Sequence, residues 1–530
     1  MDKDLFARRA LDDVAKLLTL QDRNPHSSTY GCFDRNYWHF RTIDFPSGMA
    51  QEFVWPLALA AATDVPGNAY YDSAAVRDWV EAGIRFAARA ARSDGWCDDY
   101  YPYERATGAA AFSLLACLES YRLLGLEDGD LVAFFERRAD ALAAHRESGT
   151  LSNHEALVVL CLAKLAELTG LERWNGAIAR RLERLLSWQS TEGWFREYEG
   201  CDPGYLTLTI SLLASLDAMS PELDLHASLT SAVRFAAEFI HPDGSYGGEY
   251  GCRNTYNFFP HGFELVGRFL PEALGVNDRF LEGLANGLAP CYADDHVIGH
   301  HTWSYLLAWR DFVEKRPGPP PRPEGRRVFP EAGLLIERRE GLEIYVALNK
   351  GGVFKLFRDG VFVASDTHLS LLVRGRSQVR NAVGHLIDSY KIALTDEAID
   401  VSGSLGWAKE EQMTTLKLII LRVAMLSFGR FFPNLVRRLL QRLLITGKRV
   451  APFTFRRTLG WKGGSLQVRD ELAARSWNEV EAAGIGGHQT SIYVVMSRPF
   501  QAGQLMPWQD LTQRLRRLDD GEQLIVERRL

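Results

Sequence analysis

The chain has 530 residues, of which 46% are hydrophobic and 24% are charged, and its formal net charge is −6. At roughly 100–200 residues per domain, this length suggests several domains with the composition of an ordinary globular protein. The net acidity excludes a nucleic-acid binder that works by bulk positive charge, and no apolar run approaches the ~20 residues of a transmembrane helix.

The first 18 residues, MDKDLFARRALDDVAKLL, mix acidic and basic side chains and have no uninterrupted apolar core. They therefore do not resemble a secretory signal. The seven cysteines form no CxxC pair, which disfavours a disulfide framework and a four-cysteine zinc site. We expect a cytoplasmic protein with reduced thiols, exported only if a leader segment precedes this sequence.

A repeat with a period near 50 residues runs through the first 315 residues. Each unit has a charged amphipathic helix, a glycine-rich aromatic loop and an apolar helical segment. The amphipathic helices, for example 4–18, 74–92, 171–188 and 229–240, carry apolar residues at i, i+3 and i+4. The apolar segments begin near Gln51, Glu104, Asn153, Gly204, Tyr256 and His301.

A helix that is apolar on most faces must be buried, whereas an amphipathic helix can cover it from outside. Six such pairs that close on themselves form an (α/α)6 toroid, which we predict for residues 1–314 as the catalytic domain. An open superhelix of helix pairs is the alternative. Because every aromatic loop joins an outer helix to an inner one, the loops gather at one end of the ring and line a concave bowl.

The pattern changes in the second half of the chain. Residues 315–327, KRPGPPPRPEGRR, read as an extended proline-rich linker. From 328 to 530, short strand-like runs such as LEIYVALN and VFKLFRDG alternate with Gly, Asn and Asp. The expected architecture is therefore α+β and multidomain, with a helical toroid followed by an antiparallel β-sandwich.

A basic stretch interrupts the predicted sandwich. Between Gln412 and Val468 there are eleven Lys or Arg and no Asp or Glu. About 414–450 reads as a helical insertion, with a break at Pro433. It either packs on the sandwich with solvated arginines, or is a basic amphipathic element that contacts an anionic membrane or attracts a polyanion. The sequence does not indicate the oligomeric state.

A cleft lined by aromatic and charged side chains suits a sugar polymer, because flat rings stack on sugars while charged groups bind hydroxyls and carboxylates. The side chains that we expect to contact such a substrate are Tyr37, Trp38, Tyr100, Tyr101, Arg105, Tyr256, His261, His301 and Trp303.

Two helix starts carry further polar residues. In LSNHEALVVL, Ser152 and Glu155 fit a capping box, which leaves Asn153 and His154 unexplained at the mouth of the bowl. In GCDPGYL, an Asp-Pro pair fits an N-cap followed by proline at the first helical position, and Tyr205 lies on the first turn.

These features together resemble the heparinase II/III-like polysaccharide lyases, a superfamily that includes alginate lyases. The resemblance rests on the toroid, the following sandwich, the Asn153-His154 pair and Tyr205 about fifty residues later. It implies β-elimination on a uronate-containing anionic polysaccharide or oligosaccharide. His154 and Tyr205 would serve as base and acid, in an order that stays open, and Asn153 would neutralise the substrate carboxylate.

The resemblance also raises the possibility of a metal site in the sandwich. Members of the superfamily often carry a His-x-Asp motif in the sandwich that helps to hold a metal, whereas SDTHLSLLVRG has Asp366 and His368 in the reverse order. We therefore expect no cofactor, and a divalent metal in the sandwich stays open.

Three alternative functions remain. A glycoside hydrolase on the same toroid would use Asp98, Asp99 or Glu104, because hydrolysis needs two opposed carboxylates. A uronyl C5-epimerase would share the proton abstraction without breaking the chain. A noncatalytic glycan-binding or assembly protein would use the aromatic cleft without His154. We expect no nucleic acid as a partner in any of these cases.

Overall fold

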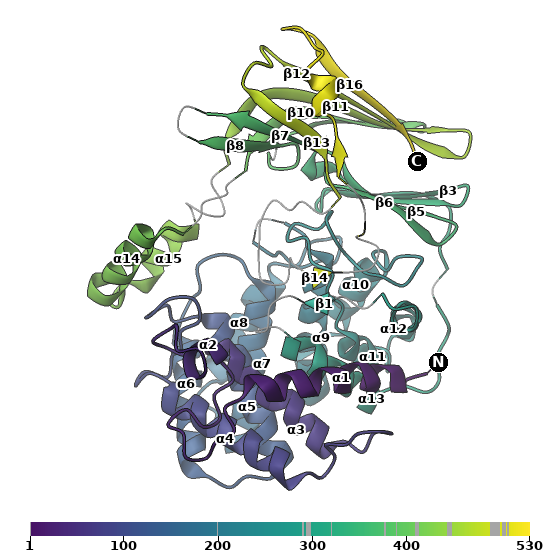
Figure 1. The fold of residues 1–530 in the computed structure, drawn as a ribbon. Coiled ribbons are helices and arrows are strands. Elements are labelled where there is room, and N and C mark those ends of the chain that lie inside the picture. The colour runs from purple at the N-terminus through teal and green to yellow at the C-terminus, as the bar shows by residue number, and fades with distance from the viewer. Residues whose placement is uncertain are drawn as a thin grey trace.

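The computed structural model describes residues 2–198, 200–288, 291–292, 298–319, 321–375, 378–387, 389–408, 413–441, 448–487, 499–500, 505 and 508–530. It combines an N-terminal helical region with a C-terminal domain of antiparallel sheets, as expected for an α+β chain (Figure 1).

The helical region alternates two kinds of helix. In α5, 14 of 18 residues are buried, whereas α8 buries four of its 12. The amphipathic partners are α1 (Asp4–Leu20), α4 (Ala74–Ala90), α6 (Gly129–Ala144), α8 (Asn175–Leu186), α10 (His226–Ala237) and α12 (Glu272–Ala285). Helix α12 departs from this contrast, because ten of its 14 residues are buried. The apolar helices are α3 (Val54–Ala62), preceded by the 3-10 turn Met49–Phe53, and α5 (Thr107–Leu124), α7 (Ser152–Thr169), α9 (Pro203–Met219), α11 (Pro260–Val266) and α13 (Ile298–Arg310).

The apolar helices contact one another in chain order, from α3 through α5, α7, α9 and α11 to α13. Helix α13 in turn contacts α3, and α1 packs against α13. The first and last helix pairs of the region are therefore neighbours in space.

Two sheets follow. The smaller is a five-stranded meander of β2 (Gly325–Phe329), β3 (Leu334–Arg339), β4 (Leu342–Ala347), β5 (Val353–Arg358) and β6 (Val361–Asp366). Strand β2 begins at Gly325, so the first strand takes up the last three residues of the predicted linker.

The larger sheet has the order β15-β13-β7-β8-β10-β11-β12-β16 within the described residues, and β9 pairs with β10. Its strands are β7 (Leu369–Arg374), β8 (Val379–Val383), β9 (Lys391–Leu394), β10 (Ala398–Trp407), β11 (Val450–Lys462), β12 (Ser465–Ala474), β13 (Val480–Ile485), β15 (Gln509–Asp510) and β16 (Gln523–Arg529). A separate short pair joins β1 (Cys291–Tyr292) to β14 (Pro499–Phe500), antiparallel.

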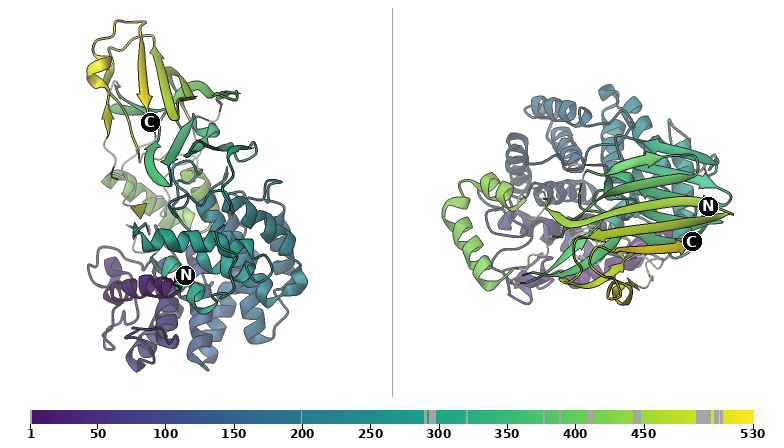
Figure 2. Two further views of the ribbon diagram at one scale, coloured as in Figure 1. Left: turned by 90° about the vertical axis from the view of Figure 1, so that its right-hand side faces the viewer. Right: turned by 90° about the horizontal axis from the view of Figure 1, so that it is seen from above.

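The central strands β3, β4 and β5 of the smaller sheet are buried on both faces. Side chains alternate along a strand, so one set, including Leu335 and Ile344, packs against the larger sheet, while Leu334, Ile336 and Tyr345 join the core of the helical region. The molecule is therefore layered, with the meander between the helices and the larger sheet (Figures 1 and 2).

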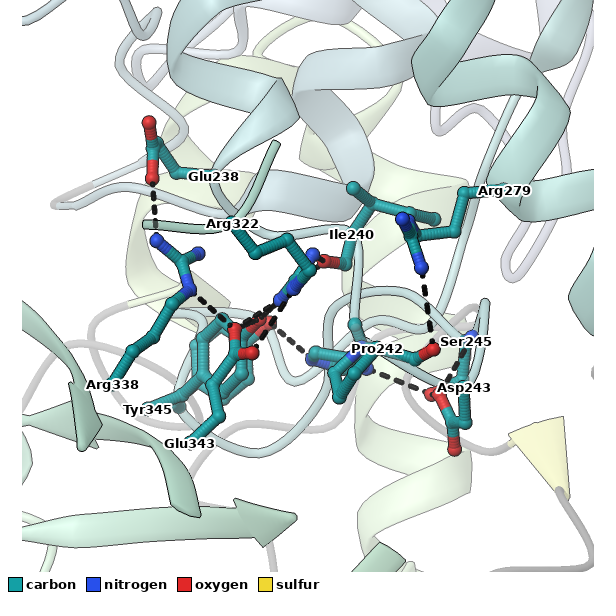
Figure 3. Close-up of polar contacts among 12 residues, drawn as sticks. Glu238, Ile240, Pro242, Asp243, Ser245, Arg279, Arg322, Arg338, Glu343 and Tyr345 are labelled. Carbon is teal, nitrogen blue, oxygen red and sulfur yellow. Dashed lines mark hydrogen bonds and ion pairs between the residues drawn. The ribbon is translucent and has the colours of Figure 1, made fainter. Parts of the chain in front are cut away.

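Buried charges fasten this meander to α10 and the residues after it (Figure 3). Arg322 pairs with Glu343 and donates to the Ile240 carbonyl at 2.7 Å and the Tyr345 hydroxyl at 2.6 Å. Arg338 lies 3.0 Å from Glu343 and 3.5 Å from a carboxylate of the helical region, that of Glu238. Such charge-assisted bonds fix the geometry of the contact as well as its energy.

The basic insertion forms a helical hairpin, which we call the arm, residues 413–441. It consists of α14 (Thr415–Ala424), a π-helical turn (Met425–Gly429) and α15 (Pro433–Gln441), so the predicted break at Pro433 is confirmed. Its ion pairs reach the helical region, from Arg422 to Asp44 at 2.9 Å and from Arg437 to Glu147 at 2.6 Å. The arm thus contacts the helical region, and in Figure 1 it stands apart from the sandwich. Among the described residues, no helix is both long and apolar enough to cross a membrane.

Candidate functional site

Helix α7 begins at Ser152, but the predicted capping box does not form. The N-cap residue is Leu151, without a side-chain bond to the helix. The Ser152 hydroxyl instead donates to Glu197 at 3.1 Å, and Glu155 accepts from Arg181 of α8 at 2.9 Å. The capping prediction was wrong because both side chains find charged partners on other elements.

Helix α9 begins as predicted. Asp202 is its N-cap and accepts from the Tyr205 backbone N–H at 3.0 Å, with Pro203 at the first helical position. The second oxygen of Asp202 accepts from the backbone N–H of Arg253 at 2.9 Å. One carboxylate therefore fixes both the first turn that carries Tyr205 and the loop that carries Arg253.

His154 is held by Glu147. Its Nδ1 lies 2.8 Å from a Glu147 oxygen, and its side chain is 23% exposed. Burial alone would lower the pKa of His154, but the Glu147 charge and hydrogen bond outweigh burial and raise the pKa above 6.5. Since a carboxylate can only accept, Nδ1 is the donor, and Nε2 is left as the basic nitrogen. A Cβ on Gly108 would lie 2.8 Å from Cε1 of this ring, so the glycine gives the imidazole its room.

Glu147 is itself held by Arg437 and His154. Burial would raise its pKa, but Arg437 of the arm and His154 bring the pKa down to about 2. The Glu147 side chain is 9% exposed and lies 2.6 Å from Arg437. The arm thus reaches the carboxylate that orients the imidazole.

Glu197 lies between the two helix starts. Burial raises its pKa to about 7, although Arg253, His154, Asn153 and Ser152 each lower it. Asn153 is 1% exposed. A buried carboxylate that titrates near neutrality beside an imidazole and a guanidinium is typical of a functional site.

Tyr205 shares these neighbours. Burial raises the pKa of its phenol, Arg253 opposes that rise and Glu197 adds to it. The phenol therefore keeps its proton at neutral pH. His154 and Tyr205 are both partly exposed, and both interact with Glu197. The Arg253 guanidinium lies 3.5 Å from the ring centroid of Tyr198, which positions it by a cation–π contact.

The sheet domain supports the loop that carries Arg253. Lys350 donates to the carbonyls of Gly251 at 2.6 Å and Glu249 at 3.0 Å, and to Asn254 at 2.7 Å. Burial lowers the pKa of Lys350 to about 8. Arg253 is thus placed by a lysine of the other domain.

A pocket of ≈ 530 Å³ opens beside this cluster. Tyr198 and Arg437 belong to both, and the expected substrate contacts Tyr100 and Tyr101 form another part of its wall. Burial raises the pKa of Tyr101 to about 12. The remaining wall comes largely from the arm, namely Met413, Leu418, Leu421, Arg422 and Leu440.

The other expected substrate contacts lie elsewhere. Tyr37 lines a second pocket of ≈ 420 Å³. The indole N–H of Trp38 donates to the Leu20 carbonyl at 2.8 Å, and Arg105 pairs with Asp94 at 3.2 Å. The structure therefore does not group these three with the His154 cluster through any contact among the described residues.

His261 and Tyr256 have partners within the protein. His261 Nε2 lies 2.9 Å from Asp311, and Tyr256 donates to Glu249. Tyr256 is 3% exposed, so little of its ring is open to a ligand.

His301 and Trp303 lie in the apolar core. His301 stacks on Phe259 with centroids 4.8 Å apart. The Trp303 indole donates to Glu52 at 2.7 Å. Both residues are less than 5% exposed, so they pack the helices more than they line a surface.

The three carboxylates of the hydrolase alternative shape one loop. Asp98 pairs with Arg92, and Glu104 accepts from the backbone N–H groups of Tyr100 at 2.8 Å and Asp99 at 3.2 Å. Burial raises the pKa of Glu104 to about 7. The Asp99 carboxylate accepts from the Ser47 hydroxyl at 2.5 Å, so each of the three carboxylates has a partner within the protein.

The reversed motif in the sandwich does not fit a divalent metal. Asp366 binds Arg457 at 3.0 Å and Arg528 at 2.6 Å, and His368 Nδ1 accepts from the Leu369 N–H at 2.7 Å. Because two guanidinium groups already hold Asp366, the residues form a buried ion-pair cluster.

Sequence reasoning missed four residues of the cluster, namely Glu147, Glu197, Arg253 and Arg437. The first three lie in the recurrent aromatic loops, so their position in the repeat was a usable signal. Nothing local distinguishes Arg437 from the other arginines of the basic stretch.

No protein-family model and no curated protein match the chain. Among solved structures, a Streptomyces coelicolor A3 chondroitin AC lyase in complex with chondroitin sulphate is similar over 99% of this chain and 78% of its own, with 10% identity and a TM-score of 0.49. A Paenibacillus xanthan lyase is similar over 91% of this chain, with 10% identity and a TM-score of 0.48, and this chain covers 46% of its length. A sugar epimerase from a ruminal bacterium is similar over 59% of this chain and 100% of its own, with 12% identity and a TM-score of 0.42. Because these TM-scores stay below 0.5, only the chain's own side chains can indicate its chemistry.

Proposed function

We propose that the chain is a polysaccharide lyase that cleaves a uronate-containing anionic glycan by β-elimination. The observation that carries this proposal is the shared environment of His154 and Tyr205, which open the adjacent helices α7 and α9 and both interact with Glu197. An imidazole that can accept a proton and a phenol that retains one are the two groups that such an elimination needs.

The fold that we propose for the helical region is the closed (α/α)6 toroid. The contact from α13 back to α3 supports a ring over an open superhelix, in which the terminal pairs would lie apart. A ring also brings the loops before α7, α9 and α11 to one end, where the cluster lies.

In the proposed reaction, His154 Nε2 takes the proton from C5 of the uronate. The electron pair forms the C4–C5 double bond, the C4–O4 bond breaks, and O4 takes the proton of Tyr205. The phenolate then regains a proton through solvent as the imidazolium gives one up, so the protein returns to its starting state.

The substrate carboxylate must be neutralised, because it resists the negative charge that develops at C5. Asn153 and Arg253 are each 1% exposed, so in this proposal they act on it from the buried floor of the cluster, Asn153 as a hydrogen-bond donor and Arg253 as a full positive charge beside Tyr205. We therefore add Arg253 to the three site residues, and we assign Glu147 and Glu197 as positioning groups for His154 and Asn153.

The test is an ultraviolet absorbance assay on a panel of uronate polymers. A lyase generates an unsaturated uronate that absorbs, and His154→Ala and Tyr205→Phe should each reduce the rate by about 10²–10⁴-fold. Tyr71→Phe is the matched control, since Tyr71 is an exposed side chain that lines neither pocket, and it should leave the rate unchanged.

The same panel separates the alternatives. New reducing ends without absorbance would indicate hydrolysis, and solvent deuterium at C5 without shortening would indicate an epimerase. Full activity in both His154→Ala and Tyr205→Phe would overturn the assignment of these residues.

A further inference from the structure

The arm has a charge unlike the rest of the chain. Residues 413–441 contain Lys417, Arg422, Arg430, Arg437 and Arg438 and no acidic residue, while the whole chain carries −6. Arg422 and Arg437 pair with the helical region, and Lys417, Arg430 and Arg438 are exposed.

Helix α14 exposes an apolar stripe. Leu416, Ile419, Ile420 and Val423 follow the i, i+3, i+4, i+7 spacing, and each is between 53% and 66% exposed. Such a stripe ordinarily faces a core. Here it faces solvent, while Leu418 and Leu421 on the opposite side of the helix line the ≈ 530 Å³ pocket.

The hairpin end and α15 continue this surface. Phe431, Phe432, Leu435 and Leu439 are each between 54% and 64% exposed. Of the 27 large apolar side chains that are exposed among the described residues, 12 lie in the arm. This density differs from the scattered single apolar residues of an ordinary surface.

We propose that the arm docks the protein on an anionic phospholipid bilayer. Apolar side chains interleaved with cations, without an acidic residue, complement a surface of acyl chains and negative headgroups. A second copy of the arm fits less well, because pairing two arms would bring their cations together. The two helices are short, so the arm lies in the plane of the interface and does not cross the bilayer.

Docking would have a consequence for the neighbouring site. The arm forms one wall of the ≈ 530 Å³ pocket and carries Arg437 to Glu147. The side of the arm that lines this pocket would therefore face away from the lipid, with the arm between the pocket and the bilayer. This consequence uses the pocket geometry alone and holds whether or not the chain is a lyase.

The experiment is co-sedimentation of the full chain with vesicles. Vesicles of equal parts phosphatidylcholine and phosphatidylglycerol should bind the protein, and pure phosphatidylcholine should bind it at least about tenfold more weakly. The double variant Ile420→Glu, Phe431→Glu should lose anionic binding by about tenfold or more. Its matched control is Val361→Glu, Ile392→Glu, which alters exposed apolar residues outside the arm and should bind as the parent does.

Thermal melts verify that each variant is folded, and light scattering measures the oligomeric state. Absence of binding to the anionic vesicles, or equal binding by the arm variant, would overturn the proposal. A dimer that the arm variant dissociates, without lipid binding, would make the arm a self-association surface and would also overturn it.

Discussion

Replacing Glu147 with glutamine removes the carboxylate that both His154 and Arg437 contact. Glutamine has the shape of the protonated side chain, so the variant measures how much the negative charge contributes to the folding free energy. Each pKa unit corresponds to about 1.4 kcal/mol. The difference between the ordinary 4.5 and the pKa of about 2 for Glu147 is therefore worth roughly 3 kcal/mol of folding free energy at neutral pH.

The sign follows from the direction of this pKa. The pKa of Glu147 is depressed by folding, so its contribution is present above 4.5 and is lost as the pH falls toward about 2. Glu147→Gln should thus lower the free energy of unfolding by about 3 kcal/mol at pH 7 and by about 2 kcal/mol at pH 3.5.

Urea unfolding of the parent and the variant, followed by tryptophan fluorescence at both pH values, measures this difference. Glu167→Gln is the control, because Glu167 forms an exposed surface ion pair with Arg122 at 3.2 Å. This variant should lower the free energy of unfolding by less than about 1 kcal/mol. A loss in Glu147→Gln that equals this control, or that does not depend on pH, would refute the reasoning.

Three further outcomes can be measured on the proposed activity. If His154 is the base, kcat/KM should rise as the pH passes through the raised pKa of His154. Glu147→Gln should move this rise to lower pH, because burial lowers the pKa of His154 once the Glu147 charge is gone. A pH–rate profile that does not move would contradict this. Gly108→Ala should cost about 10²-fold in turnover, because the new Cβ displaces the His154 ring, while circular dichroism shows an intact helix; full turnover would mean that the ring adapts. Lys350→Met should reduce turnover about as strongly by releasing the loop of Arg253, and a steady-state assay with unchanged kcat would show that the loop holds without it.

The sequence predicts the helices well where local rules act. The opening helix, expected over 4–18, spans Asp4–Leu20, and Asp202 caps α9 as its Asp-Pro signal indicates. The capping box failed because Ser152 and Glu155 interact with residues far along the chain, which no local pattern records.

The candidate site was only partly predictable for the same reason. Asn153, His154 and Tyr205 could be predicted because each lies on the first turn of a helix, where the sequence pattern indicates the helix start. Arg437 follows His154 by almost 300 residues and reaches Glu147 only because the arm folds back across the helical region. Repeat spacing has no information about such a return.

The five-stranded meander contributes side chains to the cores on both of its faces, and this limits which fragments of the chain can fold. Leu334, Ile336 and Tyr345 complete the core of the helical region from outside it. A fragment that ends before β3 would expose the apolar surface of the helical region that these side chains cover. It would also lose the hydrogen bonds from Lys350 to the loop that carries Arg253. Expression of the helical half alone should therefore yield insoluble or inactive material. Limited proteolysis between the two halves should not release two folded fragments.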